Sequence, residues 1–142
     1  MTLRTRLATM ARMAWASPCT LLGLLFGVVV LAFGGTARRV GPALEFALTR
    51  QPYAALPNPF RWPFSAITLG HVIVGVSADE LERLRAHEQA HVRQYERWGP
   101  LFLLAYPACS LFAILQGKPA HAHNHFELQA CREAAHSTKG AR

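Results

Sequence analysis

The run from His87 to His91, with the sequence His-Glu-Gln-Ala-His, constrains the fold of this chain more than any other feature. On a helix its two imidazoles lie one turn apart on the same face, where they can supply two ligands of a tetrahedral zinc ion. Glu88, between them, is placed to take a proton from zinc-bound water. Two histidines alone rarely make a closed site, so the fold must bring a further ligand to this face.

The run lies in a helix predicted over residues 77–98. Ser77 and Glu80 have the spacing of a capping box, and Gly99-Pro100 is a stop signal. Positions three and four residues apart form one stripe, as on a buried helix face: Leu81, Leu84, Glu88, His91, Tyr95 and Trp98. The opposite face is polar, as on a solvated surface: Glu82, Arg85, Gln89, Arg93 and Glu96.

Glu88 and His91 occupy two places of this otherwise apolar stripe. A lone buried carboxylate costs on the order of several kcal/mol unless something compensates it. A dication bound by the neighbouring imidazoles would do so. The alternative is a glutamate paired with a nearby arginine, beside histidines that only form hydrogen bonds. Because the motif, its helix and its expected burial agree, the sequence favours the metal site.

An apolar segment without charge, residues 13–37, precedes this region. A membrane-spanning helix needs about 20 apolar residues, whereas a cleaved signal peptide commonly has an apolar stretch of about 7–15. The length favours a retained anchor. A signal peptide remains the alternative, because 32–34 and 35–37 both have the small residues of a cleavage site.

The flanking charges bear on the orientation of this segment. They are Arg4, Arg6 and Arg12 before it, and Arg38 and Arg39 after it. Their balance favours an inside N-terminus, so we expect a single-pass membrane protein with its catalytic domain on the extracytoplasmic side.

The net charge of +7 comes mainly from scattered arginines. They form no basic stretch interleaved with aromatic residues and no nucleic-acid motif, so we expect membrane lipid and no nucleic acid among the partners. Cys19, Cys109 and Cys131 are odd in number and widely spaced, and two of them lie in apolar surroundings, which favours buried free thiols over a disulfide framework or a cysteine metal site.

Little regular structure is expected between the anchor and the predicted helix. Residues 38–65 form a connector rich in proline and aromatic residues, in which 40–48 could be a short strand or helix. Residues 66–75 are β-branched and bounded by serine and glycine, which predicts one strand. With two or three strands at most, any sheet is small. His71, inside that strand, is expected to be structural.

Residues 100–116 form a second uncharged stretch, long enough to cross a membrane. We expect it instead to be a hydrophobic helix that folds back against the first. A second crossing would place His91 and everything after Lys118 on opposite sides of the membrane, and no later residue could then join the metal.

Glu127 is the favoured third ligand. Asn124 is placed to cap a second helix, on which Glu127, Ala130, Cys131 and Ala134 share one face. Glu127 also fits the reciprocal acid of a capping box. Its competitors for the metal are His123 and His125, which belong to a loose His-x-His-x-His pattern that also fits a flexible polar tract.

HExxH on one helix, followed by Glu-x-x-Ala on a later one, resembles the gluzincin branch of the zincin metallopeptidases. Gly70-His71 and the Asn-x-Phe-Glu-x-x-Ala run are also similar to those of small bacterial membrane-anchored proteins. The resemblance implies that His87, His91 and Glu127 bind one zinc ion and that Glu88 is the general base. The chain departs from better-known gluzincins at Cys131-Arg132, where these have an acidic residue.

The expected fold is mainly α with a small β element (α+β): an N-terminal transmembrane helix followed by a compact zincin-like helical domain. Its parts are an anchor or signal peptide over 1–37, the connector over 38–65, the metal-binding domain over 66–137 and a tail over 138–142.

The expected function is hydrolysis of peptide bonds by zinc-bound water and a glutamate base, in a membrane-anchored metallopeptidase-like protein. A strand at 66–75 could pair with an extended peptide or protein substrate. Tyr106, His123 and His125 are candidates for stabilising the oxyanion. The alternative is a non-catalytic small membrane protein, with a structural metal closed by four protein ligands or a hydrogen-bonded His/Glu site.

Overall fold

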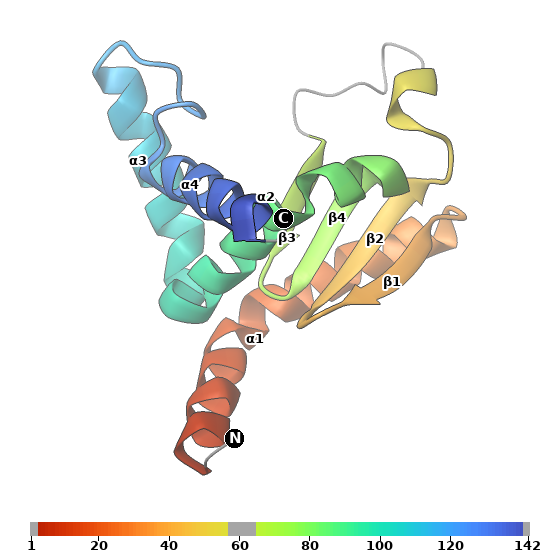
Figure 1. Ribbon diagram of the computed structural model, residues 1–142, viewed down its shortest axis with the longest axis horizontal. Helices are drawn as coiled ribbons and strands as arrows, with labels where there is room; N and C mark the ends of the chain where they lie inside the picture. The colour runs from red at the N-terminus through yellow and green to blue at the C-terminus, as the bar shows by residue number, and fades with distance from the viewer. Residues whose placement is uncertain (1–2, 57–64, 141–142) are drawn as a thin grey trace.

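The computed structural model describes residues 3–56 and 65–140, with side chains up to residue 137. The chain is mainly α-helical with one small sheet, which confirms the expected α+β class. In chain order the elements are α1 (Leu3–Ala32), β1 (Thr36–Val40), β2 (Ala43–Thr49), the 3-10 turn η1 (Tyr53–Ala55), β3 (Ala66–Leu69), β4 (Val72–Ser77), α2 (Ala78–Trp98), the 3-10 turn η3 (Gly99–Leu101), α3 (Phe102–Leu115) and α4 (His125–Gly140) (Figure 1).

In the described part of the chain the sheet has four strands in the order β1-β2-β4-β3, more than the two or three expected. The neighbours β1–β2 and β3–β4 are antiparallel, whereas β2 and β4 run parallel. The segment 66–75 is therefore not one strand. Gly70 adopts a φ of 62° and reverses the chain, so that Ala66 pairs with Gly75 in a hairpin. Within the connector a short strand or helix was expected over 40–48, and a strand, β2, forms over Ala43–Thr49. β1, which precedes it across a turn at Gly41, was not expected.

α1 packs against one face of the sheet through a stripe of mostly small residues, spaced three and four apart: Ala16, Cys19, Gly23, Gly27 and Val30. A β-carbon on Gly23 would lie 2.6 Å from that of Val72, and one on Gly27 would lie 2.6 Å from the ring of Phe46. The helix therefore approaches the strands too closely for larger side chains. The segment expected as a separate anchor shares a core with the sheet.

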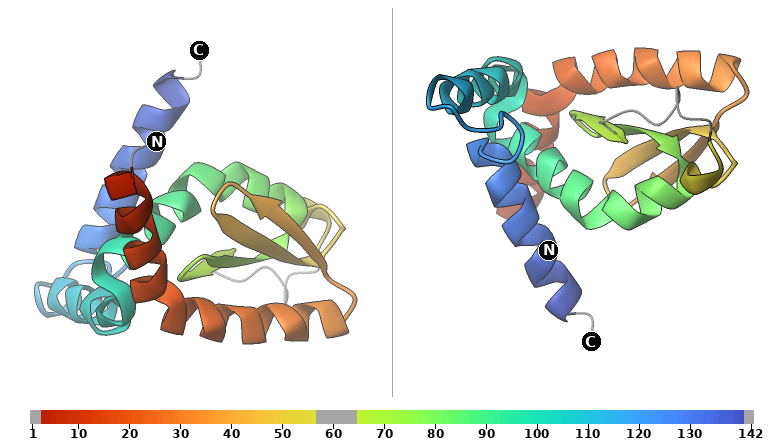
Figure 2. Two further views of the ribbon diagram at one scale, coloured as in Figure 1. Left: turned by 90° about the horizontal axis from the view of Figure 1, so that it is seen from below. Right: turned by 90° about the horizontal axis from the view of Figure 1, so that it is seen from above.

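α2 covers the opposite sheet face, as the two views of Figure 2 show. The apolar contacts between them join Ala43, Ala47, Ile73, Leu81 and Val92. The expected capping box is wrong: Ser77 is the N-cap but makes no side-chain cap hydrogen bond, and its hydroxyl binds the carboxylate of Asp79. Glu80 pairs with Arg83 instead.

The predicted stop at Gly99-Pro100 is confirmed. α2 ends at Trp98, and Gly99 takes a φ of 54°, pressed against the indole of Trp15 on α1. η3 and α3 then lead away, and the chain returns through α4, which packs beside α2 (Figure 1). Asn124 caps α4 as expected, because its Oδ1 accepts a hydrogen bond from the backbone N–H of Phe126.

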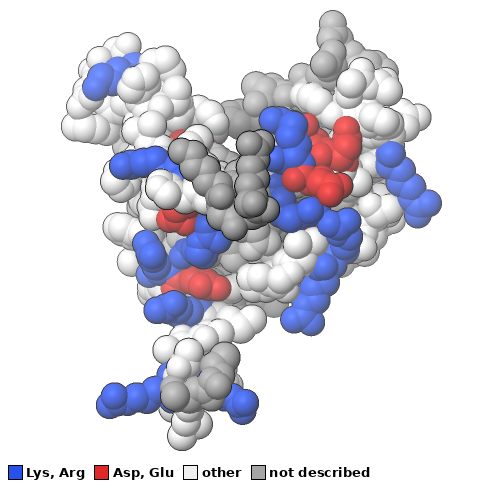
Figure 3. All heavy atoms as spheres, in the orientation of Figure 1, with Lys and Arg blue, Asp and Glu red and all other residues white. Residues whose placement is uncertain are grey.

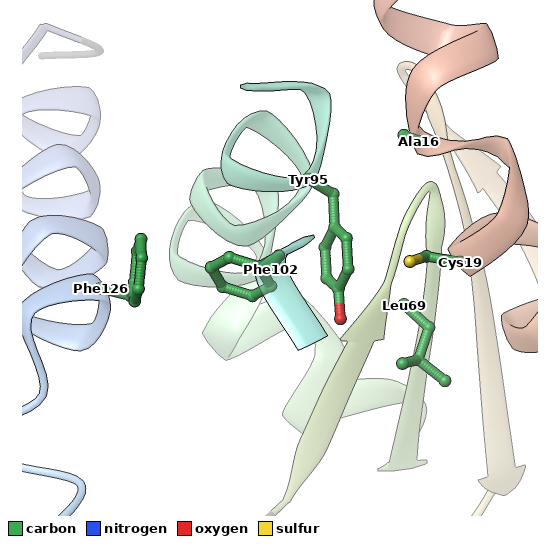
Figure 4. Close-up of a cluster of buried hydrophobic side chains, with 6 residues drawn as sticks. All are labelled: Ala16, Cys19, Leu69, Tyr95, Phe102 and Phe126. Atoms are coloured by element: carbon green, nitrogen blue, oxygen red, sulfur yellow. The ribbon is translucent and has the colours of Figure 1, made fainter. Parts of the chain in front are cut away.

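One apolar cluster joins α1 and the sheet to the helices α2, α3 and α4. It contains Ala16, Cys19, Leu69, Tyr95, Phe102 and Phe126, contributed by α1, β3 and the three later helices. In Figure 4 the ring of Tyr95 faces Cys19 and Leu69, while Phe102 lies between Tyr95 and Phe126. The Phe102 ring contacts both aromatic neighbours, with centroids 4.5 Å and 4.8 Å away. This stack positions α4 relative to the sheet.

By length and composition, two helical segments among residues 3–56 and 65–140 can cross a membrane: Leu3–Ala32 and Ala78–Leu115. Most residues in the most apolar part of each segment are not buried in the protein. Only 28% of the most apolar window of the first segment is buried, and 17% of that of the second. These fractions leave large apolar faces open on α1 and α3.

We predict that Gly27→Leu lowers the free energy of unfolding by about 1–3 kcal/mol, because the new side chain overlaps the Phe46 ring. Leucine also favours a helix over glycine by about 0.8 kcal/mol, so any loss reflects packing. Urea unfolding in detergent would measure it. Val28→Leu, on the exposed side of α1, is the matched control and should leave the midpoint unchanged. Equal midpoints for both variants would contradict packing of α1 on the sheet.

Candidate metal centre

His87, His91 and Glu127 lie together, with one ligand atom from each within 4.8 Å of the others. The two Nε2 atoms of the histidines are 3.1 Å apart. Glu127 Oε2 lies 3.1 Å from Nε2 of His87, and Oε1 lies 3.4 Å from Nε2 of His91. The three side chains expected as ligands therefore converge, although Glu127 is 36 positions after His91 in the chain.

These separations fit a single small cation. Around a tetrahedral zinc ion with bonds of about 2.0–2.1 Å, neighbouring donor atoms lie about 3.3 Å apart. Glu127 Oε2 is also buried without a hydrogen bond of acceptable geometry, despite its closeness to His87. A buried carboxylate oxygen in this position is costly unless a positive charge satisfies it. The donor set and the unbonded oxygen both suit a metal ion.

Glu127 is held as a carboxylate. Burial by itself would raise its pKa, but the imidazoles of His87 and His91 and the hydroxyl of Tyr106 outweigh burial and hold that pKa well below its usual range. The Tyr106 hydroxyl donates to Glu127 Oε1 at 2.6 Å. A deprotonated oxygen ligand is what a divalent cation requires.

Gln94 sets the tautomer of His91. Its side-chain amide donates to the carbonyl of Phe126 at 3.0 Å and to Gln129 Oε1 at 3.3 Å, so its own oxygen must face His91. That oxygen lies 2.8 Å from Nδ1 of His91. Nδ1 must then carry the proton, which leaves the lone pair on Nε2 to face the other ligands. The same side chain ties α2 to the residue that precedes Glu127.

Cys131 lies beside His87, the other candidate histidine ligand. Its Sγ lies 3.8 Å from Nδ1 of His87, at the position where the resemblance to gluzincins breaks down. A thiol is a weak hydrogen-bonding partner, so His87 is oriented less firmly than His91. The three cysteines are free thiols, as expected, but only Cys19 is buried and Cys131 is exposed.

Glu88 lies outside the ligand set but next to it. It is buried, and one of its carboxylate oxygens accepts a 2.6 Å hydrogen bond from the hydroxyl of Thr68. Thr68 belongs to β3, the strand at one end of the sheet order. The edge strand therefore orients the carboxylate expected to act as the base.

A cavity of about 950 Å³ opens beside these residues. Among the described residues its lining combines His87, Glu88, His91 and Glu127 with apolar side chains of the sheet and of α3. Tyr106 and His121 also line it, and His121 Nε2 lies 3.5 Å from Glu127 Oε2. The candidate metal centre is thus accessible from one side through an apolar cleft.

The other candidate histidines lie away from the metal centre. His123 and His125 are exposed and lie outside the ligand group and the cavity lining. Tyr106, the third candidate for stabilising the oxyanion, lines the cavity beside Glu127. His71 is structural, as expected, but it lies in the hairpin turn and not within a strand. Its backbone N–H donates to Thr20 Oγ1, and its Nε2 lies 3.2 Å from Glu96.

Thr68, Gln94 and His121 also reach the site, although they were not among the candidate residues expected from the sequence. Gln94 carries a sequence signal, because it follows His91 by three positions and so shares its helix face. His121 carries another, because it is the first histidine of the His-x-His-x-His pattern. Thr68 comes from a separate strand, and nothing in the local pattern connects it with the motif.

Comparison of the chain with family models, with curated proteins and with solved structures finds no match, so its site is interpreted from its own geometry.

We predict that the purified full chain carries one zinc ion and that His91→Ala loses it, because one of three converging ligands is removed. Native mass spectrometry and elemental analysis would measure the metal content. His123→Ala, which alters an exposed histidine outside the group, is the matched control and should keep the metal. Equal zinc content in the wild type and His91→Ala would disprove the site.

A second prediction concerns Gln94. Gln94→Met keeps the side-chain volume but removes the acceptor for His91 Nδ1, so zinc affinity should fall by about 10–100-fold. Competition with a chromophoric chelator would give the affinity, and circular dichroism would confirm the fold. Gln116→Met, on an exposed residue, should bind zinc like the wild type. An unchanged affinity in Gln94→Met would show that Gln94 does not orient the ligand.

Proposed function

We propose that this protein is a membrane-associated, gluzincin-like zinc metallopeptidase that hydrolyses peptide bonds. His87, His91 and Glu127 would hold the zinc ion, and Glu88 would act as general base. The observation that carries the proposal is the convergence of three ligand atoms at zinc-like spacing, beside a buried carboxylate and an open cleft. A zinc ion held there would polarise a substrate carbonyl and lower the pKa of a bound water toward about 7.

The residues of the chain have distinct parts in this chemistry. Glu88 accepts the proton of the attacking water and passes it to the leaving amine. Thr68 holds one oxygen of that carboxylate, so the carboxylate is oriented before the substrate arrives. The lone pair on His91 Nε2, set by Gln94, and the deprotonated Glu127 provide ligands that need no rearrangement.

Tyr106 is the favoured group for stabilising the oxyanion. Of the three candidates from the sequence, only its side chain lines the cleft. Burial, together with the hydrogen bond to Glu127, raises the pKa of the Tyr106 phenol, so it keeps its proton and remains a donor. Its single O–H is donated to Glu127 in this structure, so stabilising the oxyanion would require that proton to turn from Glu127 to the substrate oxygen.

The substrate class follows from the edge strand and the cleft. β3 is the last strand of the sheet order, and its Thr68 contacts the proposed base. An extended peptide added beside β3 would carry its backbone past Glu88. The apolar lining of the cleft favours hydrophobic side chains in that peptide.

Membrane association is part of the proposal because the apolar faces of α1 and α3 are largely unburied. If residues 13–37 cross the membrane, the flanking arginines would favour the extracytoplasmic side for the site.

A structural metal site is the second candidate. His121 favours it, because its imidazole contacts Glu127 and could supply a fourth protein ligand. Against it, His121 is 60% exposed in its side chain and belongs to the lining of an accessible cleft. A catalytic site keeps one coordination position for water or substrate, and this cleft provides the access such a position needs.

We predict that Glu88→Gln keeps zinc but lowers the rate of peptide hydrolysis by about 10²–10⁴-fold, because the amide cannot accept the proton. Cleavage of a fluorogenic hydrophobic peptide, followed alongside zinc content, would test this. Glu82→Gln, on the exposed face of the same helix, is the control and should keep both properties. Wild-type activity in Glu88→Gln would remove Glu88 from its role, and absence of hydrolysis in a zinc-loaded wild type would favour the structural alternative.

A further inference from the structure

The outer face of α1 is apolar and unburied. It carries Leu21, Leu22, Leu25, Phe26, Val28 and Val29, all of them exposed. The inner face holds the small residues that pack on the sheet. The two faces of α1 therefore differ in side-chain size, with large side chains on the outer face and mostly small ones on the inner face. Exposure of so much apolar surface to water is unfavourable, so a helix face of this kind marks an interaction surface.

α1 bends within its N-terminal half. Pro18 has no N–H for the carbonyl of Ala14, and the hydroxyl of Ser17 donates to that carbonyl instead, at 2.7 Å. In both views of Figure 2 the N-terminal part of the helix turns away from the part that lies along the sheet. α3 lies at the same edge of the molecule as this second part in both views.

α3 adds further exposed apolar side chains at this edge. They are Leu103, Leu104, Leu111, Phe112, Ile114 and Leu115. The face that carries α2 and α4 is different, because acidic and basic side chains are interspersed over it (Figure 3). The molecule is therefore amphipathic as a whole.

A full crossing by α1 conflicts with this packing. Residues 16–30 of α1 lie against the strands, so the sheet would enter the hydrocarbon together with the helix. β1 and β3 end the strand order, and β1 carries the exposed Arg38 and Arg39. Open sheet edges and exposed arginines are not tolerated in the bilayer core.

We infer that the second part of α1, with α3, lies in the surface of a lipid bilayer, with the outer apolar face in one leaflet and the sheet in water. This arrangement differs from the single crossing that the sequence alone favours. It buries the large side chains of α1 in lipid and keeps every strand outside it. The arginines at the two ends of the apolar segment then lie at headgroup level.

Charge complementarity favours anionic lipid over a second copy of the chain. Arg12 precedes the apolar face, Arg38 and Arg39 follow it, and no acidic residue occurs before Glu45. Two copies packed through α1 would bring arginines together in either helix orientation. Anionic headgroups would neutralise both ends at once.

Labelling of single cysteines in spheroplasts distinguishes the two topologies. In a Cys109→Ser, Cys131→Ser background, which removes the two native thiols that are not buried and leaves only the buried Cys19, Arg6→Cys and Arg39→Cys report the two ends of α1. We expect a membrane-impermeant maleimide to treat both positions alike. It labels both in intact spheroplasts if α1 lies on the outer surface, and both only after permeabilisation if α1 lies on the inner surface. Labelling of one position from outside, and of the other only after permeabilisation, would establish a crossing and overturn the inference.

Vesicle binding tests the lipid contact itself. The purified wild type should bind vesicles containing phosphatidylglycerol more strongly than vesicles of phosphatidylcholine alone, and Leu25→Glu with Phe26→Glu should weaken binding at least tenfold. Leu128→Glu, at an exposed leucine on α4, is the matched control and should bind like the wild type. Unchanged binding in the double variant would overturn the inference, as would a stable dimer that needs Leu25 and Phe26 and ignores vesicles. None of these outcomes depends on whether the site hydrolyses peptides.

Discussion

The return of α4 against α2 is the contact on which the candidate site depends. α2 supplies both candidate histidine ligands and the proposed base, but the third candidate ligand lies beyond a 14-residue apolar helix and a turn. Phe126 inserts into the aromatic cluster with Phe102, and Gln94 binds the carbonyl of the same Phe126. One apolar and one polar contact thus fix the residue next to Glu127. Without them His87 and His91 would be two neighbouring histidines on a helix.

The apolar N-terminal helix has two roles in this structure because its two faces differ. Its small inner residues allow close approach to the sheet, and Trp15 covers Gly99 where α2 ends. Cys19 joins the cluster that contains Phe126. The helix therefore supports the end of α2 and, through the aromatic stack, the position of α4. Its outer face remains exposed, so the proposed membrane contact and the integrity of the site depend on the same helix.

The stop at Gly99, the cap at Asn124 and the histidine pair of the candidate site were predictable from local patterns. Gly99 ends α2 because only glycine tolerates both its φ and the indole against it, and Asn124 caps α4 through its side chain. The sheet was harder to predict. Its strands are four to seven residues long, and the reversal at Gly70 lies within a run of β-branched residues that is typical of one strand. The parallel pairing of β2 with β4 is a contact across the chain that no local pattern encodes.

The sequence by itself determined which residues can hold a metal, because HExxH spacing on a helix places two imidazoles on one face whatever surrounds them. It also determined that two segments are apolar enough for a membrane, since that depends on composition alone. Only the tertiary structure decided that Glu127 joins the histidines, that Thr68 and Gln94 orient the groups there, and that α1 lies along a sheet. Those outcomes depend on contacts between residues far apart in the chain, whose geometry is set by how the side chains of several elements pack together.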